Sequence, residues 1–176
     1  MSGKRWIIAA VFIFLCMNLA ANEQGFTFKP YYGGGGFSGV IGGTGDYGLG
    51  GVGEFAFLFF DKGFQMGLSF IGRGDGITTE QGNNYGTGSI LGKVSFGGFF
   101  PVNFLRSYTF VEGGVGFGGG NGTAATNLIF GGGGGIDLFY HRTGSIYLEV
   151  GYLQHYVNNE LMGGVSLVIG SRGYFR

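Results

Sequence analysis

Bulky apolar residues alternate with small or polar residues over most of this chain. In the segment FQMGLSF, residues 64–70, an apolar side chain occupies every second position, and glutamine, glycine and serine lie between them. Residues 146–152 and 165–170 follow the same rule. Successive side chains of a β-strand point to opposite faces, so this period of two predicts strands with one bulky face and one small or polar face.

Eight such strands are predicted. They lie near residues 26–36, 47–60, 63–72, 88–100, 107–118, 127–139, 145–157 and 161–172. Their lengths suit the tilted spans of about 9–11 residues with which a strand crosses a bilayer. Short turns at 61–63, 101–106 and 140–144 alternate with connections at 37–46, 73–87, 119–126 and 158–160. In bacterial barrels the short turns face the periplasm and the longer loops face outwards, which predicts the orientation of the chain.

Composition distinguishes a barrel from a soluble sandwich. Glycine supplies 43 of the 176 residues, and charged residues only 11%. Glycine and serine cannot fill the core of a sandwich, but they suit the narrow interior of an eight-stranded barrel. The bulky faces then contact lipid, and the barrel must close because an open strand edge would leave backbone groups unsatisfied in hydrocarbon. The predicted fold is therefore an all-β, eight-stranded antiparallel up-and-down transmembrane β-barrel.

The N-terminus has the pattern of a secretory signal peptide. Lys4 and Arg5 precede an apolar run over 6–17, and small residues follow up to Ala21. We expect a cleaved signal peptide over 1–21, with cleavage after Ala20 as an alternative, and the barrel over 22–176. An uncleaved anchor and a lipoprotein attached through Cys16 are the other interpretations.

The segments YTFVEGGVGF, residues 108–117, and IYLEVGY, residues 146–152, together with the glycine-rich strands and aromatic C-terminus, resemble the small outer-membrane barrels of the OmpA, OmpX, OmpW and opacity-protein superfamily. The resemblance is architectural and covers the chain after the signal peptide. The last strand departs from the pattern at Met162, where a polar residue is usual, and the chain ends in Arg176 rather than an aromatic residue.

The resemblance implies a monomer in the bacterial outer membrane, without a cofactor. The partners it implies are outer-membrane lipid, lipopolysaccharide-type lipid, the assembly machinery and an extracellular or host ligand at the outer loops. The zero formal net charge gives no field for nucleic acid.

The strand phases direct a set of charged residues into the barrel, where they are far less costly than on a lipid face. This predicted polar network of the lumen comprises Lys29, Glu54, Lys93, Glu112, Asp137, Glu149 and Arg172. Lys93 is expected to pair with Glu54, Glu112 or both. The resemblance to OmpA implies that such pairs plug the lumen, and an ion pathway is the alternative.

The other motifs of the sequence are weaker indicators of function. Arg73-Gly74-Asp75 opens the longest outer connection, where it is either an integrin-type surface ligand or an ordinary turn. His141 and His155 lack a neighbouring nucleophile, and the chain after residue 21 has no cysteine, so neither an enzyme nor a metal site is predicted. The glycine runs 33–36 and 131–135 leave room for an aromatic ring on the next strand or bend the wall.

The predicted role is structural, adhesive or that of a narrow path for small solutes. A secreted soluble glycine-rich β protein, such as an attacin-like antimicrobial, is the alternative from another class. A lipid-modifying enzyme of the outer membrane is the third.

Overall fold

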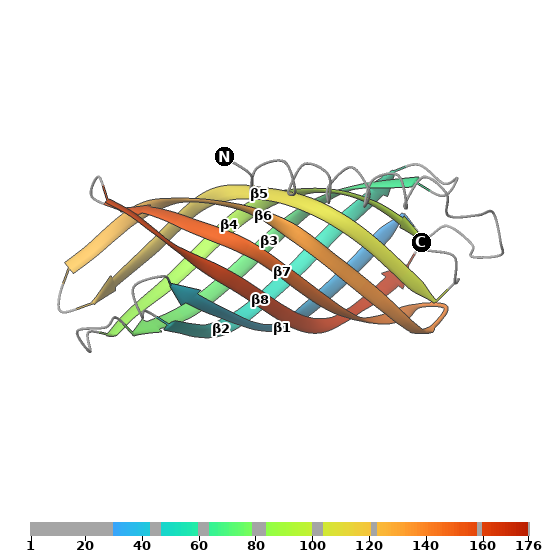
Figure 1. The fold of residues 1–176 in the computed structure, drawn as a ribbon, viewed down its shortest axis with the longest axis horizontal. Coiled ribbons are helices and arrows are strands. Elements are labelled where there is room, and N and C mark those ends of the chain that lie inside the picture. The colour runs from blue at the N-terminus through green and yellow to red at the C-terminus, as the bar shows by residue number, and fades with distance from the viewer. Residues whose placement is uncertain are drawn as a thin grey trace, which may run out of the picture.

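The computed structural model describes residues 30–42, 47–59, 64–78, 84–99, 104–120, 123–157 and 160–175. They form one closed barrel in which each strand is antiparallel to the next and the last pairs with the first. The strands are β1 (Tyr31–Gly42), β2 (Tyr47–Phe59), β3 (Phe64–Thr78), β4 (Asn84–Phe99), β5 (Leu105–Gly120), β6 (Thr123–His141), β7 (Gly144–Val157) and β8 (Glu160–Phe175). Figure 1 shows them wrapping obliquely around a long axis. The predicted fold class is confirmed, while the expected signal peptide lies outside the described residues.

Several strands extend further than their side-chain pattern predicts. Strand β3 continues to Thr78 and β4 begins at Asn84, because the ladder between them persists through pairs such as Asp75 with Thr87. The predicted outer connection over 73–87 is therefore wrong, and only 79–83 separates the two strands. The predicted strand over 26–36 likewise ends too early, since β1 runs to Gly42 along both β2 and β8. The ends of these strands are therefore determined by backbone pairing with long neighbouring strands, not by the alternation of side chains.

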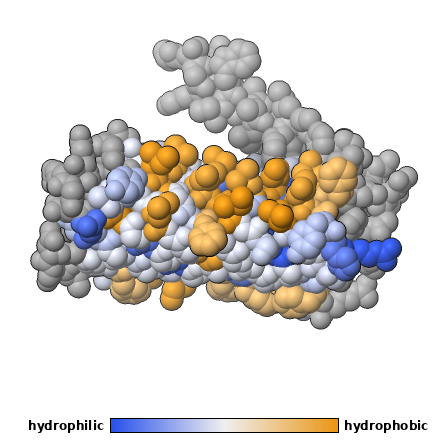
Figure 2. All heavy atoms as spheres, turned by 90° about the horizontal axis from the view of Figure 1, so that it is seen from below, coloured by the Kyte–Doolittle hydropathy of each residue, from blue (hydrophilic) through white to orange (hydrophobic). Residues whose placement is uncertain are grey.

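The barrel is apolar outside and polar inside. Phe37, Ile90 and Val111 are 79%, 65% and 61% exposed on the outer wall, and Figure 2 shows apolar side chains spread along one face of that wall. Leaving aside Glu160, the first residue of β8, the charged residues of the described strands all lie on the inward face of their strands. No helix among the described residues is long and apolar enough to cross a membrane.

The interior is layered along the axis. We call the end where β2–β3, β4–β5 and β6–β7 connect the turn end, and the opposite end the loop end. The buried cluster of Tyr32, Ala56, Leu58 and Tyr174, with Phe139 packed against it, fills the lumen at the turn end. A second buried apolar cluster lies towards the loop end and comprises Ile71, Leu91, Ile129 and Leu153. Most of the charged residues lie between the two clusters.

Two of the inward glycines make room for large side chains on neighbouring strands. A Cβ atom on Gly34 would lie 2.8 Å from Cγ of Arg172, its partner on β8. A Cβ on Gly135 would lie 2.8 Å from Cε2 of Tyr108, its partner on β5. Glycine in a strand costs roughly 0.5–1 kcal/mol against alanine, but here it admits the residues that fill the lumen.

Candidate functional site

Arg172 lies at the centre of the charged interior. Strand β8 directs its fully buried guanidinium across the lumen, where it meets carboxylates from three other strands. Its Nη2 is 2.6 Å from Oε2 of Glu54 and 2.6 Å from Oε1 of Glu149, and its Nη1 is 2.7 Å from Oδ1 of Asp137. One side chain thus links β8 to β2, β6 and β7.

Tyrosine rings surround the same guanidinium. The Cζ atom of Arg172 lies 3.9 Å from the ring centroid of Tyr147, 4.8 Å from that of Tyr32 and 5.3 Å from that of Tyr108. These distances are within the range of about 6 Å for cation–π attraction. The Tyr32 hydroxyl donates to Glu54 Oε1 at 2.9 Å, and the Tyr108 hydroxyl donates to Glu149 Oε1 at 2.8 Å. The rings therefore both cover the cation and hold its carboxylates in place.

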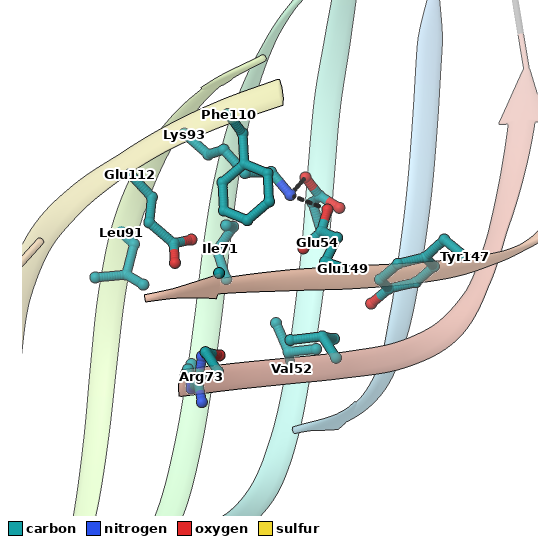
Figure 3. Close-up of a pocket in the computed structure, with 13 residues that line it drawn as sticks. Val52, Glu54, Ile71, Arg73, Leu91, Lys93, Phe110, Glu112, Tyr147 and Glu149 are labelled. Atoms are coloured by element: carbon teal, nitrogen blue, oxygen red, sulfur yellow. Dashed lines mark hydrogen bonds and ion pairs between the residues drawn. The ribbon is translucent and has the colours of Figure 1, made fainter. Parts of the chain in front are cut away.

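Lys93 joins this network from β4. Its buried Nζ is 2.6 Å from Oε1 of Glu54 and 2.8 Å from Oε1 of Glu149, and it lies 5.2 Å from the ring centroid of Phe110. Figure 3 shows both contacts as dashed lines. Glu54 is one of the two expected partners. The other partner is Glu149 rather than Glu112, although Glu112 lies directly opposite Lys93 on β5, because the long lysine side chain reaches across the narrow lumen.

Arg106 is a further member of the network, and the side-chain pattern does not predict it. The sequence predicts a turn over 101–106, but β5 begins at Leu105 and directs Arg106 inwards. Its Nη1 is 2.9 Å from Oδ2 of Asp137, and its guanidinium lies 4.9 Å from the ring centroid of Tyr108. Arg106, Tyr108 and Glu112 occupy alternate positions of β5, whose side chains point inwards. Extending this alternation back to residue 106 would have predicted an inward Arg106. Lys29 lies outside the described residues.

Arg73 and Asp75 form a separate polar layer nearer the loop end. The expectation that they open an exposed loop is wrong, because β3 carries both side chains into the lumen, where they are buried. Arg73 Nε is 2.6 Å from Asp75 Oδ2, and Arg73 Nη1 donates to Ser166 Oγ at 3.2 Å. Asp75 Oδ1 also accepts from Ser38 Oγ at 2.7 Å. Only Gly74 of this tripeptide faces outwards, so the motif does not form a surface loop.

Glu112 lies beside a small cavity. The cavity measures about 20 Å³ as space for the centres of water molecules, which is room for one or two of them. Its walls include Arg73, Leu91 and Glu112 on one side of the lumen and the cluster of Lys93, Glu54 and Glu149 on the other. Glu112 is half-buried and has no ion-pair partner among the described residues.

The two histidines lie far apart along the axis. His155 is buried near the loop end and its Nδ1 accepts from Asn127 Nδ2 at 3.3 Å. His141 is exposed at the turn end, where its Nδ1 lies 2.9 Å from the hydroxyl of Thr143. Among the described residues, no group of three histidine, cysteine, aspartate or glutamate side chains could hold a metal ion.

Comparison with known proteins supports the fold. No protein-family model matches the chain, and no curated protein matches its sequence. The crystal structure of Neisserial surface protein A, NspA, superposes with a TM-score of 0.56 at 14% identity, covering 83% of this chain and 97% of that one. Ail, the attachment invasion locus protein of Yersinia pestis, has a TM-score of 0.46 at 14% identity, with 82% of this chain and 99% of that one covered.

At this level of identity the likeness describes architecture alone. The chain has the fold of the small eight-stranded barrels, and the predicted resemblance to them is confirmed in that sense. NspA is one solved structure with which it shares that architecture over most of both chains.

Proposed function

We propose that this protein is an integral β-barrel of the bacterial outer membrane, a monomer whose closed lumen makes it a surface scaffold rather than a pore. The observation that carries the proposal is the inverted distribution of side chains, with apolar residues outside and charges inside. A charge on the lipid face costs about 2–4 kcal/mol near the bilayer midplane, so a strand surface without charges suits lipid. Closure of β8 on β1 leaves no free strand edge, which suits a monomer.

The outer wall argues against the secreted soluble alternative. Soluble monomers rarely expose continuous apolar patches larger than a few hundred Å². Here large apolar residues are exposed on all eight strands, including Phe37, Phe55, Phe70, Ile90, Phe117, Leu128, Val150 and Ile169. We infer that hydrocarbon chains of outer-membrane lipid and of lipopolysaccharide-type lipid cover this wall, and that the barrel-assembly machinery inserts the protein.

The interior favours a structural or adhesive role over permeation. An eight-stranded barrel has a lumen just wide enough for side chains to fill. In this barrel the network around Arg172 and the apolar cluster at the turn end both cross the lumen. The related fold of a neisserial surface protein supports a location at the cell surface. A ligand from outside the cell would then meet the connections at the loop end.

Location and orientation can be tested together with epitope tags. A tag inserted between Thr78 and Asn84 should be labelled by antibody on intact cells, and the protein should fractionate with the outer membrane and show heat-modifiable gel mobility. The matched control is the same tag inserted between Arg142 and Thr143, in the turn at the opposite end, which should be labelled only after permeabilisation. Recovery in a soluble fraction, or labelling of the second tag alone on intact cells, would contradict the proposal.

A further inference from the structure

One hydrogen-bond donor of the outer polar layer has no acceptor. Arg73 is buried, and two of its three nitrogens are used. Its Nε contacts Asp75 Oδ2 at 2.6 Å, and its Nη1 donates to Ser166 Oγ at 3.2 Å. The third nitrogen, Nη2, has no hydrogen-bond partner among the described residues. A buried donor without a partner is costly, so Arg73 Nη2 requires an acceptor.

Glu112 is an acceptor that no basic side chain contacts directly. Strand β5 directs it into the lumen, where its Oε1 would lie 3.4 Å from a Cβ atom added to Gly131, its partner on β6. Among the described residues, Arg73 forms its ion pair with Asp75 and Lys93 forms its ion pairs with two other carboxylates. A carboxylate accepts several hydrogen bonds, so Glu112 is available to a donor that reaches it.

Arg73 and Glu112 line the same cavity. Figure 3 shows both side chains in its wall. The cavity offers about 20 Å³ to the centres of water molecules, and a buried water needs about 10–15 Å³ by this measure. Two polar groups that are too far apart for a direct hydrogen bond are often joined by a water molecule between them. The cavity therefore has both the room and the polar groups for such a bridge.

The wall of the cavity favours a neutral ligand over an ion. Arg73 and Lys93 bring two positive charges to it, which disfavour a cation. Glu54, Glu112 and Glu149 bring three carboxylates, which disfavour an anion. A water molecule has lone pairs for the arginine N–H and O–H groups for a carboxylate. Water is thus the small ligand that matches the chemistry on both sides.

We propose that this cavity is the binding site of one ordered water molecule, which joins Arg73 to Glu112. Its oxygen accepts from Arg73 Nη2, and one of its O–H groups donates to the Glu112 carboxylate. Ser166 and Glu149, in the same wall, offer acceptors for the second O–H. The bridge is an ion pair mediated by water, and it connects β3 to β5, which are not neighbours in the sheet. This site is additional to the proposed surface role and does not depend on it.

A crystal structure at a resolution that shows ordered water tests the site directly. The wild type should show a water peak about 2.7–3.2 Å from both Arg73 Nη2 and a Glu112 carboxylate oxygen. Glu112→Gln keeps an accepting Oε1 and should keep this peak, whereas Glu112→Leu should lose it. A cavity without a water peak in the wild type would overturn the proposal, as would a direct contact between Arg73 and Glu112 or an unchanged peak in Glu112→Leu.

Urea unfolding from phosphatidylcholine vesicles tests the bridge in a membrane. Glu112→Leu should lower the midpoint of unfolding, because it removes the group to which the water donates, and Glu112→Gln should leave the midpoint unchanged. In a protein that already carries Arg73→Met and Asp75→Asn, the donor of the bridge is gone, so Glu112→Leu should lower the midpoint by less or not at all. Equal shifts with and without Arg73 would overturn the proposal, as would an unchanged midpoint for Glu112→Leu alone.

Discussion

The two polar layers of the lumen are built differently. In the central network, Arg172 meets Glu54 across 118 residues of sequence, and Lys93 meets Glu149 across 56. In the outer layer, Arg73 pairs with Asp75 two residues away on the same strand. These two central pairs connect strands that are not neighbours, whereas the Arg73–Asp75 ion pair forms within β3 alone.

This difference indicates which layer holds the barrel closed. Arg172 is on the last strand and meets its partners on β2, β6 and β7 only when β8 has joined the sheet. The ion pair of Arg73 with Asp75 does not itself link β3 to another strand, and this layer reaches β8 and β1 through hydrogen bonds with the hydroxyls of Ser166 and Ser38 rather than through ion pairs. We therefore expect substitutions in the central network to cost more than substitutions in the outer layer.

Arg172→Met should have the largest effect. It leaves three buried carboxylates with fewer counter-charges, and removal of one partner from a buried ion pair costs about 3–5 kcal/mol. We expect the free energy of unfolding to fall by an amount at or above the upper end of that range. Urea unfolding from vesicles, monitored by gel mobility and circular dichroism, measures this loss. Arg142→Met, in the exposed turn between β6 and β7, is the control and should cost less than about 1 kcal/mol. Equal losses in the free energy of unfolding of the two variants would contradict the central role of Arg172.

Lys93→Met should cost less, about 3 kcal/mol, because Arg172 still contacts both of its carboxylate partners. Adding Glu149→Gln to this variant should restore part of the lost stability, since it removes a carboxylate that has lost a counter-charge. If the second substitution makes the protein less stable still, Lys93 and Glu149 do not form the pair described here.

The double substitution Arg73→Met with Asp75→Asn should cost still less, about 1–3 kcal/mol, because it removes both charges of the local pair together and leaves only polar contacts to be lost. The side-chain oxygen that remains at position 75 can still accept from Ser38, and the central network is unchanged. The same urea titration measures the effect. A loss greater than that of Lys93→Met would reverse the comparison between the two layers.

Glu112→Gln should have the smallest effect of the four on stability, with no loss relative to the wild type. The glutamine keeps the shape of the side chain and removes the one lumen carboxylate without an ion-pair partner among the described residues. The midpoint of urea unfolding from vesicles provides the measurement. A loss of several kcal/mol, the cost of disrupting a buried ion pair, would mean that Glu112 belongs to the central network.

The sequence predicts the strands and their inward faces well, because both depend on a local period of two. Glu54, Lys93, Asp137, Glu149 and Arg172 all lie on the face that this period assigns to the lumen. The ends of strands are not local, since pairing with a long neighbour extends β3 past Arg73 and Asp75. Arg106 was missed for the same reason, because β5 begins before its apolar alternation does.

The sequence also could not predict which charged residues form ion pairs inside the lumen. Lys93 lies opposite Glu112 on the neighbouring strand, but its Nζ contacts Glu54 and Glu149. That outcome depends on the width of the lumen and on the position of Arg172, which draws both carboxylates to the centre. Pairing along strands can be inferred from register, whereas pairing across a barrel requires its closed shape.

Conductance of the wild-type protein in planar bilayers tests the central claim most directly. The central network and the apolar cluster at the turn end both cross the lumen, so we predict no steady ionic current at moderate voltage. Heat-modifiable gel mobility of the same sample would show that the inserted protein is folded. A steady current proportional to voltage from that folded protein would contradict the account, because it would require a continuous water path through the residues that close the barrel.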